Sequence, residues 1–206
     1  MSRLYALVAL ATLFTFGCGS GAIQLTRDEY SRLPREYRLE LFDAQNDLVI
    51  ARNRQDEAED KKEDAERALS ELNARWDRTS KRLSSSGQAA KIPRARHVFD
   101  TNVAYISSQI DVAAAGILRA EAETRVRQAR LELVGQRQAA RIGRATTGAI
   151  KPFEANVAKL DEQLKAATTA EVDLRAKVQA QLTAWKVAED EFVAAASDYD
   201  TGVWEN

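Results

Sequence analysis

Apolar and small residues recur in steps of three and four over three long stretches of the chain. In the first stretch, these positions form the series Leu41, Ala44, Leu48, Ala51, Gln55, Ala58, Lys62, Ala65, Leu69, Leu72, Trp76, Thr79 and Leu83. Only Gln55, Lys62 and Thr79 are polar. A seam that repeats every 3.5 residues on average, over several heptads, is typical of a coiled coil. The pattern predicts a long helix over about residues 34–83.

Two further stretches carry the same pattern and predict helices over about residues 94–142 and 152–199. The seam of the second is Val98, Thr101, Tyr105, Ser108, Val112, Ala115, Arg119, Ala122, Val126, Ala129, Leu133, Gln136 and Ala140. The seam of the third is Phe153, Val157, Leu160, Leu164, Ala167, Glu171, Leu174, Val178, Gln181, Trp185, Ala188, Phe192, Ala195 and Tyr199. Ile106, Ile110 and Ile117 widen the apolar face of the second helix, which favours contact with two neighbours.

Residues that break helices separate these stretches. Ser84 to Gly87 precede Pro93, and Gly143 and Gly148 precede Pro152. Short connections between helices of equal length favour antiparallel neighbours. The sequence therefore predicts an all-α, elongated, antiparallel three-helix coiled-coil bundle with up-down-up topology, about 70–75 Å long at 1.5 Å per residue. A two-helix hairpin whose third helix packs in another subunit is the alternative arrangement.

The chain begins with the features of an export signal. Arg3 precedes an uncharged apolar run, Leu4 to Phe16, which is too short to span a bilayer as a mature helix. Gly17 and Cys18 follow, and Cys18 is the only cysteine. The segment Thr15-Phe16-Gly17-Cys18 resembles the lipobox of bacterial lipoproteins, although Thr15 and Phe16 replace the commoner leucine and small residue. The alternative is an ordinary cleaved signal followed by an incidental cysteine.

This resemblance implies cleavage before Cys18, acylation of that residue with chains such as palmitate, and a place in the bacterial cell envelope. Gly19, where aspartate could stand, resembles the outer-membrane sorting pattern of enteric bacteria, so we expect the protein in the outer membrane and facing the periplasm. The predicted organisation is a signal peptide over 1–17, the lipidated cysteine and a tether over 18–33, the bundle over 34–200 and a tail over 201–206. Thr26 to Glu29 have the pattern of a capping box, which marks a helix start inside the tether.

Composition excludes most catalytic chemistry. The chain has 206 residues, a net charge of -1, one cysteine and one histidine, His97. It therefore lacks a disulfide framework and a multi-histidine metal centre. The sequence also contains no motif of nucleotide binding. The acidic run over 56–60 is interleaved with lysines and favours a solvated helical face. We expect no enzyme, cofactor, metal, small-molecule substrate or nucleic acid, and we expect Trp76 and Trp185 to be core anchors.

The up-down-up arrangement places the second connection beside the membrane and the first at the far tip. Basic residues near the second connection, Arg137, Arg141, Arg144 and Lys151, are a candidate surface for anionic lipid. The alternative is that the arginines only offset the negative end of the helix dipole. Trp204 in the tail is a candidate contact for a protein partner, unless it folds back on the bundle.

These observations favour a lipid-anchored periplasmic scaffold or adaptor in an envelope assembly, with an unknown protein partner and the capacity for homo-oligomers. A tether or spacer that binds peptidoglycan non-covalently is the alternative. The chain ends Val203-Trp204-Glu205-Asn206 and so lacks the C-terminal lysine with which the major helical lipoprotein of enteric bacteria attaches covalently.

Overall fold

The computed structural model describes residues 25–195, and all of its regular structure is helical. The α-helices are α2 (Arg27–Arg32), α3 (Arg35–Ser85), α4 (Ile92–Arg141) and α5 (Lys151–Ala195), with short 3-10 helices η1 (Ala89–Lys91) and η2 (Thr147–Ala149). The prediction of an all-α chain whose long helices pack on one another is confirmed. The described part holds four α-helices, because α2 forms a separate helix within the predicted tether.

The capping box at the start of α2 is present as predicted. The Thr26 hydroxyl accepts a hydrogen bond from the Glu29 backbone N–H, and a Glu29 carboxylate oxygen accepts one from the Thr26 backbone N–H at 2.8 Å. The helix ends after one and a half turns, since the residue before a proline is disfavoured in the helical region. Leu33, which precedes Pro34, is extended and buried. Pro34 then caps α3 with an extended backbone.

Glycines with positive φ end the two long helices that lead into turns. Gly87 has φ 75° and Gly143 has φ 77°, a conformation that a residue with a Cβ rarely adopts. In each turn the next backbone N–H reaches back to a carbonyl in the last helical turn, from Gln88 to Leu83 and from Arg144 to Ala139. These bonds satisfy carbonyls that the helix leaves free.

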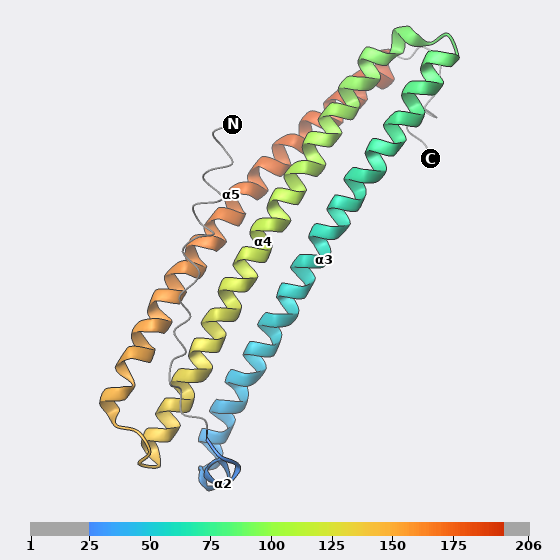
Figure 1. Ribbon diagram of the computed structural model, residues 1–206. Coiled ribbons are helices and arrows are strands. Elements are labelled where there is room, and N and C mark those ends of the chain that lie inside the picture. Colours follow the sequence, from blue (N-terminus) through green and yellow to red (C-terminus); the bar gives the residue numbers. More distant parts are fainter. Residues whose placement is uncertain (1–24, 196–206) are drawn as a thin grey trace.

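Helix α4 lies between α3 and α5 and packs along both of them (Figure 1). The predicted preference of the second long helix for two neighbours is thereby confirmed. In contrast, the α3 and α5 backbones make only marginal contact with each other, so α4 provides most of the packing between the long helices. We call the end with the turn over residues 86–91 the tip, and the end with α2 and the turn over residues 142–150 the base.

The main hydrophobic core occupies the tip half. It joins Leu72, Trp76, Leu83, Ala95, Val98, Phe99, Ile106, Ala188 and Phe192 from all three long helices. Trp76 stacks on Phe99 at 5.0 Å between ring centroids, and Tyr105 stacks on Trp185 at 5.5 Å. Both predicted core tryptophans therefore belong to this packing, Trp76 as a buried member and Trp185 as a half-buried one.

Candidate functional site

Two carboxylates are buried in the middle of the molecule, below the hydrophobic core of the tip. Glu123 on α4 is 6% exposed and Glu171 on α5 is 5% exposed. Arg119, one turn before Glu123, lies between them. Its guanidinium is 2.6 Å from Glu171 and 3.6 Å from Glu123. A buried carboxylate is costly unless a cation and hydrogen bonds compensate it, and Arg119 provides both.

Two more arginines, one on each outer helix, bind the same two carboxylates. Arg54 on α3 donates to Glu123 at 2.6 Å, and Arg175 on α5 donates to Glu171 through two nitrogens at 2.6 and 3.1 Å. The five residues Arg54, Glu123, Arg119, Glu171 and Arg175 form a continuous chain across α3, α4 and α5, which we call the central ion network. It joins the two outer helices through α4 although they hardly touch each other.

The electrostatics of the network keep Glu171 ionised. Burial raises the pKa of this carboxyl, but the hydrogen bonds and positive charges of Arg175 and Arg119 outweigh burial and lower the pKa below 4.5. Because both of its oxygens are engaged by arginines, Glu171 is not set up as a general acid or base at neutral pH. The arrangement suits alignment of helices better than proton transfer.

A groove of about 970 Å³ opens beside the network, lined by all three long helices. Small residues make it possible, since Ala65 and Ala68 on α3 face Ala113 and Gly116 on α4. A methyl group added at Gly116 would meet a Glu171 oxygen at 3.9 Å, which is ordinary contact. The charges along the walls are of both signs, so the groove has no strong preference for an anion or a cation.

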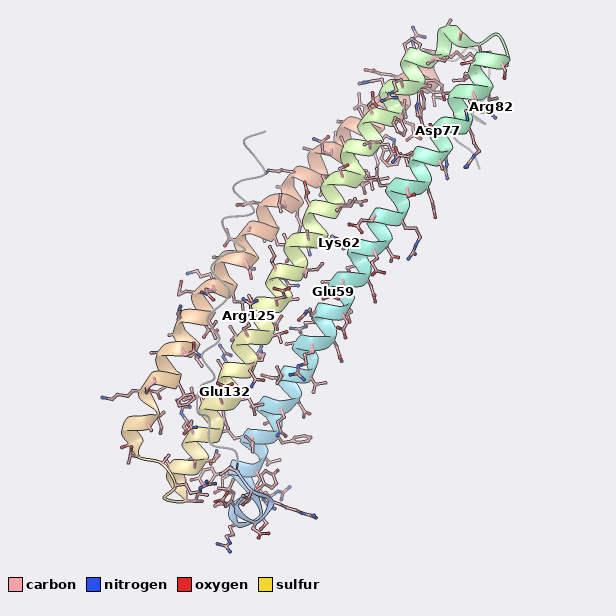
Figure 2. The ribbon with its side chains drawn as sticks, viewed as in Figure 1. Glu59, Lys62, Asp77, Arg82, Arg125 and Glu132 are labelled. Atoms are coloured by element: carbon pink, nitrogen blue, oxygen red, sulfur yellow. The ribbon has the colours of Figure 1, made fainter. Side chains whose placement is uncertain are left out.

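Ion pairs between helices also run from the base to the middle of the molecule. Along α3 and α4 they join Glu40 to Arg141, Asp47 to Arg127 and Arg54 to Glu123. Along α4 and α5 they join Arg137 to Glu154, Arg130 to Asp161 and Arg119 to Glu171. In each of the two sets, the residue numbers rise along one helix while the numbers of their partners fall along the other. Figure 2 shows charged side chains continuing on the outer surfaces, with Glu59 and Lys62 midway along α3 and Asp77 and Arg82 towards the tip.

The predicted basic cluster gathers at the base, where carboxylates accompany it. Arg137 pairs with Glu154, Arg141 pairs with Glu40 and lies 3.7 Å above the Tyr37 ring, and Arg144 pairs with Glu29. The Thr26 backbone hydrogen bond lowers the pKa of Glu29 against the opposing effect of burial, and the Thr26 hydroxyl and Arg144 lower this pKa further. Lys151 opens α5 and is exposed. Lipid binding by this cluster stays a prediction, and its arginines have a structural role in addition.

Other predicted residues lie apart from the network. His97 is exposed near the start of α4, and the acidic run over 56–60 is exposed except for half-buried Ala58. Cys18 and Trp204 lie outside the described residues. Sequence reasoning placed Arg119 and Glu171 in the seams but missed that they meet, because nothing local in the sequence relates two positions on different helices.

Within residues 25–195, no cluster of three or more potential metal ligands occurs, and no helix is long and apolar enough to cross a membrane. No family model, curated protein or solved structure matches the chain.

Proposed function

We propose that the protein is a lipid-anchored helical rod that acts as a scaffold or adaptor in a bacterial envelope assembly, without catalysis of its own. Its working form is an up-down-up three-helix coiled coil. The base is held close to the membrane by acylated Cys18, and the tip is presented to a protein partner. Helices of about 50 residues give the rod a reach of roughly 75 Å at 1.5 Å per residue.

The observation that carries this proposal is the ion pair between Glu29 and Arg144, 2.8 Å long. Glu29 belongs to α2, the short helix at the end of the tether, and Arg144 belongs to the turn between α4 and α5. Their contact ties the point where the tether meets the folded region to one end of the rod. An anchor at Cys18 would then sit at the base, and the turn over residues 86–91 would point away from it.

Two measurements test the proposal in the native envelope. Metabolic labelling with a fatty-acid probe should mark the wild type and not Cys18→Ala, and labelling of both would overturn the anchor. A photo-crosslinking residue at exposed Arg94, at the tip, should capture one reproducible protein, whereas the same residue at exposed Lys159, towards the base, should not. Capture of that protein equally from both positions, or from neither, would contradict presentation by the tip.

A spacer that binds peptidoglycan is the second candidate, and the tip supplies the observation in its favour. Lys81 and Arg94 are exposed on either side of the first turn and form no ion pair within the described part of the chain. Peptide stems of the cell wall carry carboxylates that such residues could bind. Co-sedimentation with purified wall sacculi should then fall on Lys81→Glu with Arg94→Glu, and persist with Lys159→Glu. Unchanged co-sedimentation of the tip variant would reject this candidate.

A further inference from the structure

Helix α3 carries a second apolar face that no part of the described molecule covers. Leu39, Phe42, Val49 and Ile50 are 49%, 52%, 53% and 49% exposed. We call these four residues the outer stripe. At about 100° of rotation per residue, they lie on the opposite side of α3 from Leu41, Leu48 and Ala51, which are buried against α4. The other large exposed apolar residues are scattered over α4 and α5.

The outer stripe has the spacing of a second coiled-coil seam. Leu39, Phe42, Asn46 and Val49 follow one another in steps of three, four and three, and Ile50 widens the face. This is the alternation by which one helix packs on another. Asn46 is the polar member of the seam and is exposed, and a single asparagine at such a position commonly fixes the register of two helices. The outer stripe is therefore suited to a helix.

Charges along the two edges of the stripe indicate which helix fits. Arg38 and Arg52 lie along one edge, and Asp43 and Glu57 lie along the other. None of these four residues makes an ion pair within residues 25–195. Charges that border the inward face behave differently, since Glu40, Asp47 and Arg54 are all paired with α4.

We propose that the outer stripe is a parallel dimer interface with a second copy of this chain. In a parallel coiled coil, a residue on one edge meets the residue five positions later on the facing edge of the partner helix. That rule brings Arg38 to Asp43 and Arg52 to Glu57 of the second copy, twice over by symmetry. An antiparallel pair would instead set each edge against its own kind, arginine against arginine and carboxylate against carboxylate.

A parallel dimer also suits two chains that stand in one membrane, which is the only part of this inference that rests on the proposed function. The charge pattern is independent of any anchor. The stripe covers only about three helical turns, so the interface is at the small end of specific contacts. Confinement of the base to a membrane would raise the effective concentration of the chains and compensate for the small area.

The test is disulfide cross-linking of the full chain in intact cells, because Cys18 is the only native cysteine. We expect Leu39→Cys and Val49→Cys, made separately, each to give self-cross-linked dimers on mild oxidation. These positions are about 15 Å apart along a helix, so an antiparallel pair could bring only one of them against itself. The matched control is Val172→Cys, which is 59% exposed on α5 and should give no dimers.

Two disruptions, read with the Val49→Cys reporter, sharpen the result. Phe42→Lys should reduce the dimer yield at least about tenfold, as expected for a central apolar anchor, and Val172→Lys should leave it unchanged. Arg38→Glu should also reduce the yield, and adding Asp43→Arg should restore it, because the exchanged charges again meet their opposites. In an antiparallel pair, Arg38→Glu would instead increase the dimer yield, because the new carboxylate would face an arginine of the second copy.

Several outcomes would overturn the proposal. These are absence of self-cross-links at both positions, equal effects of Phe42→Lys and Val172→Lys, failure of the charge exchange to restore the dimer, or cross-links only to another protein. Labelling of the stripe by a photoreactive lipid in place of self-cross-links would assign the face to the membrane surface. Fatty-acid labelling is read from the same cells. A labelled chain without dimers therefore rejects the interface alone, and cross-linked dimers without labelling reject the anchor alone.

Discussion

The tip half and the middle of the molecule use the same three helices but are stabilised by different interactions. At the tip, Trp76 and Phe99 stack within a cluster of leucine, isoleucine and valine side chains. In the middle, alanine and glycine lie around buried Glu123 and Glu171, and arginines connect the helices. Apolar burial is favourable but tolerant of small shifts in register, whereas a buried ion network is satisfied in one alignment. We infer that the tip supplies stability and the middle supplies register.

The largest effect should come from the tip. Trp76→Ala removes a buried ring, its stack on Phe99 and its cation–π contact with Arg96. We expect it to lower the free energy of unfolding by about 3–5 kcal/mol, measured by urea denaturation followed by circular dichroism. Glu71→Ala, an exposed change in the same helix, should alter it by less than about 0.5 kcal/mol. A loss below about 1 kcal/mol for Trp76→Ala would show that the tip is not the stabilising half.

A smaller loss should follow when the central ion network is broken on one side. Glu171→Ala leaves Arg119 without its closest carboxylate, and we expect a cost of about 2 kcal/mol in the same experiment. This is below the 3–5 kcal/mol typical of buried pairs, because Arg175 is 67% exposed and Arg119 is 31% exposed.

The double variant Arg119→Met with Glu171→Leu separates register from stability. Replacing both partners with apolar residues should cost less than Glu171→Ala alone, since no buried charge is left unpaired. If the network sets register, the double variant should nevertheless show faster amide hydrogen exchange in the middle of α5. If the double variant kept both the stability and the amide hydrogen exchange of the wild type, the network would have no role in aligning the helices.

The tip half and the middle should also differ in how their contributions to stability respond to acid. The folded-state pKa of Glu171 is lowered from 4.5, so its contribution to stability is complete above that value and is lost as the pH falls through the folded-state pKa. Urea denaturation between pH 6 and 3 should therefore show a shallower decline for Glu171→Gln than for the wild type. Trp76→Ala should shift the whole curve and keep its slope. Equal slopes for Glu171→Gln and the wild type would contradict the assignment.

The smallest effect should be a gain. Gly116 lies inside α4, where glycine is less favourable than alanine, and a methyl group there would make only ordinary contact with Glu171. We expect Gly116→Ala to raise the free energy of unfolding by about 0.5–1 kcal/mol. A decrease would mean that the groove beside the network requires close approach at this position, and that the middle is more tightly packed than its small side chains suggest.

The heptad pattern predicted much of this fold because each seam is a local property of one helix. Every member of the predicted first seam, from Leu41 to Leu83, is buried or half-buried in α3. The starts and ends at Gly87, Gly143 and Pro152 lie close to the predicted ones, since these residues act through their own backbone conformation. The start of the short helix α2 was predicted from its capping box, which also acts locally, and Pro34 separates α2 from α3.

The candidate site was less predictable, for a physical reason. Arg119 and Glu171 were visible as charged residues in apolar seams, but their pairing depends on the relative register of α4 and α5. Heptads repeat, so several registers satisfy the apolar pattern almost equally. The same degeneracy concealed that α3 and α5 hardly touch, because a seam indicates that a helix has a partner and does not say which one.

The pairing of α4 with both neighbours restricts how this protein can change its length. One residue inserted into α3 would rotate every later side chain by about 100° and misalign Glu40, Asp47 or Arg54 with its partner on α4. An insertion into α4 would disturb the pairs on both sides at once. Growth or shortening that keeps these pairs aligned requires whole heptads gained or lost in all three helices together. We expect single insertions to be tolerated only at the turns over residues 86–91 and 142–150. The distance from base to tip is thus a quantity that the chain can alter only in steps of about 10 Å, one heptad at a time.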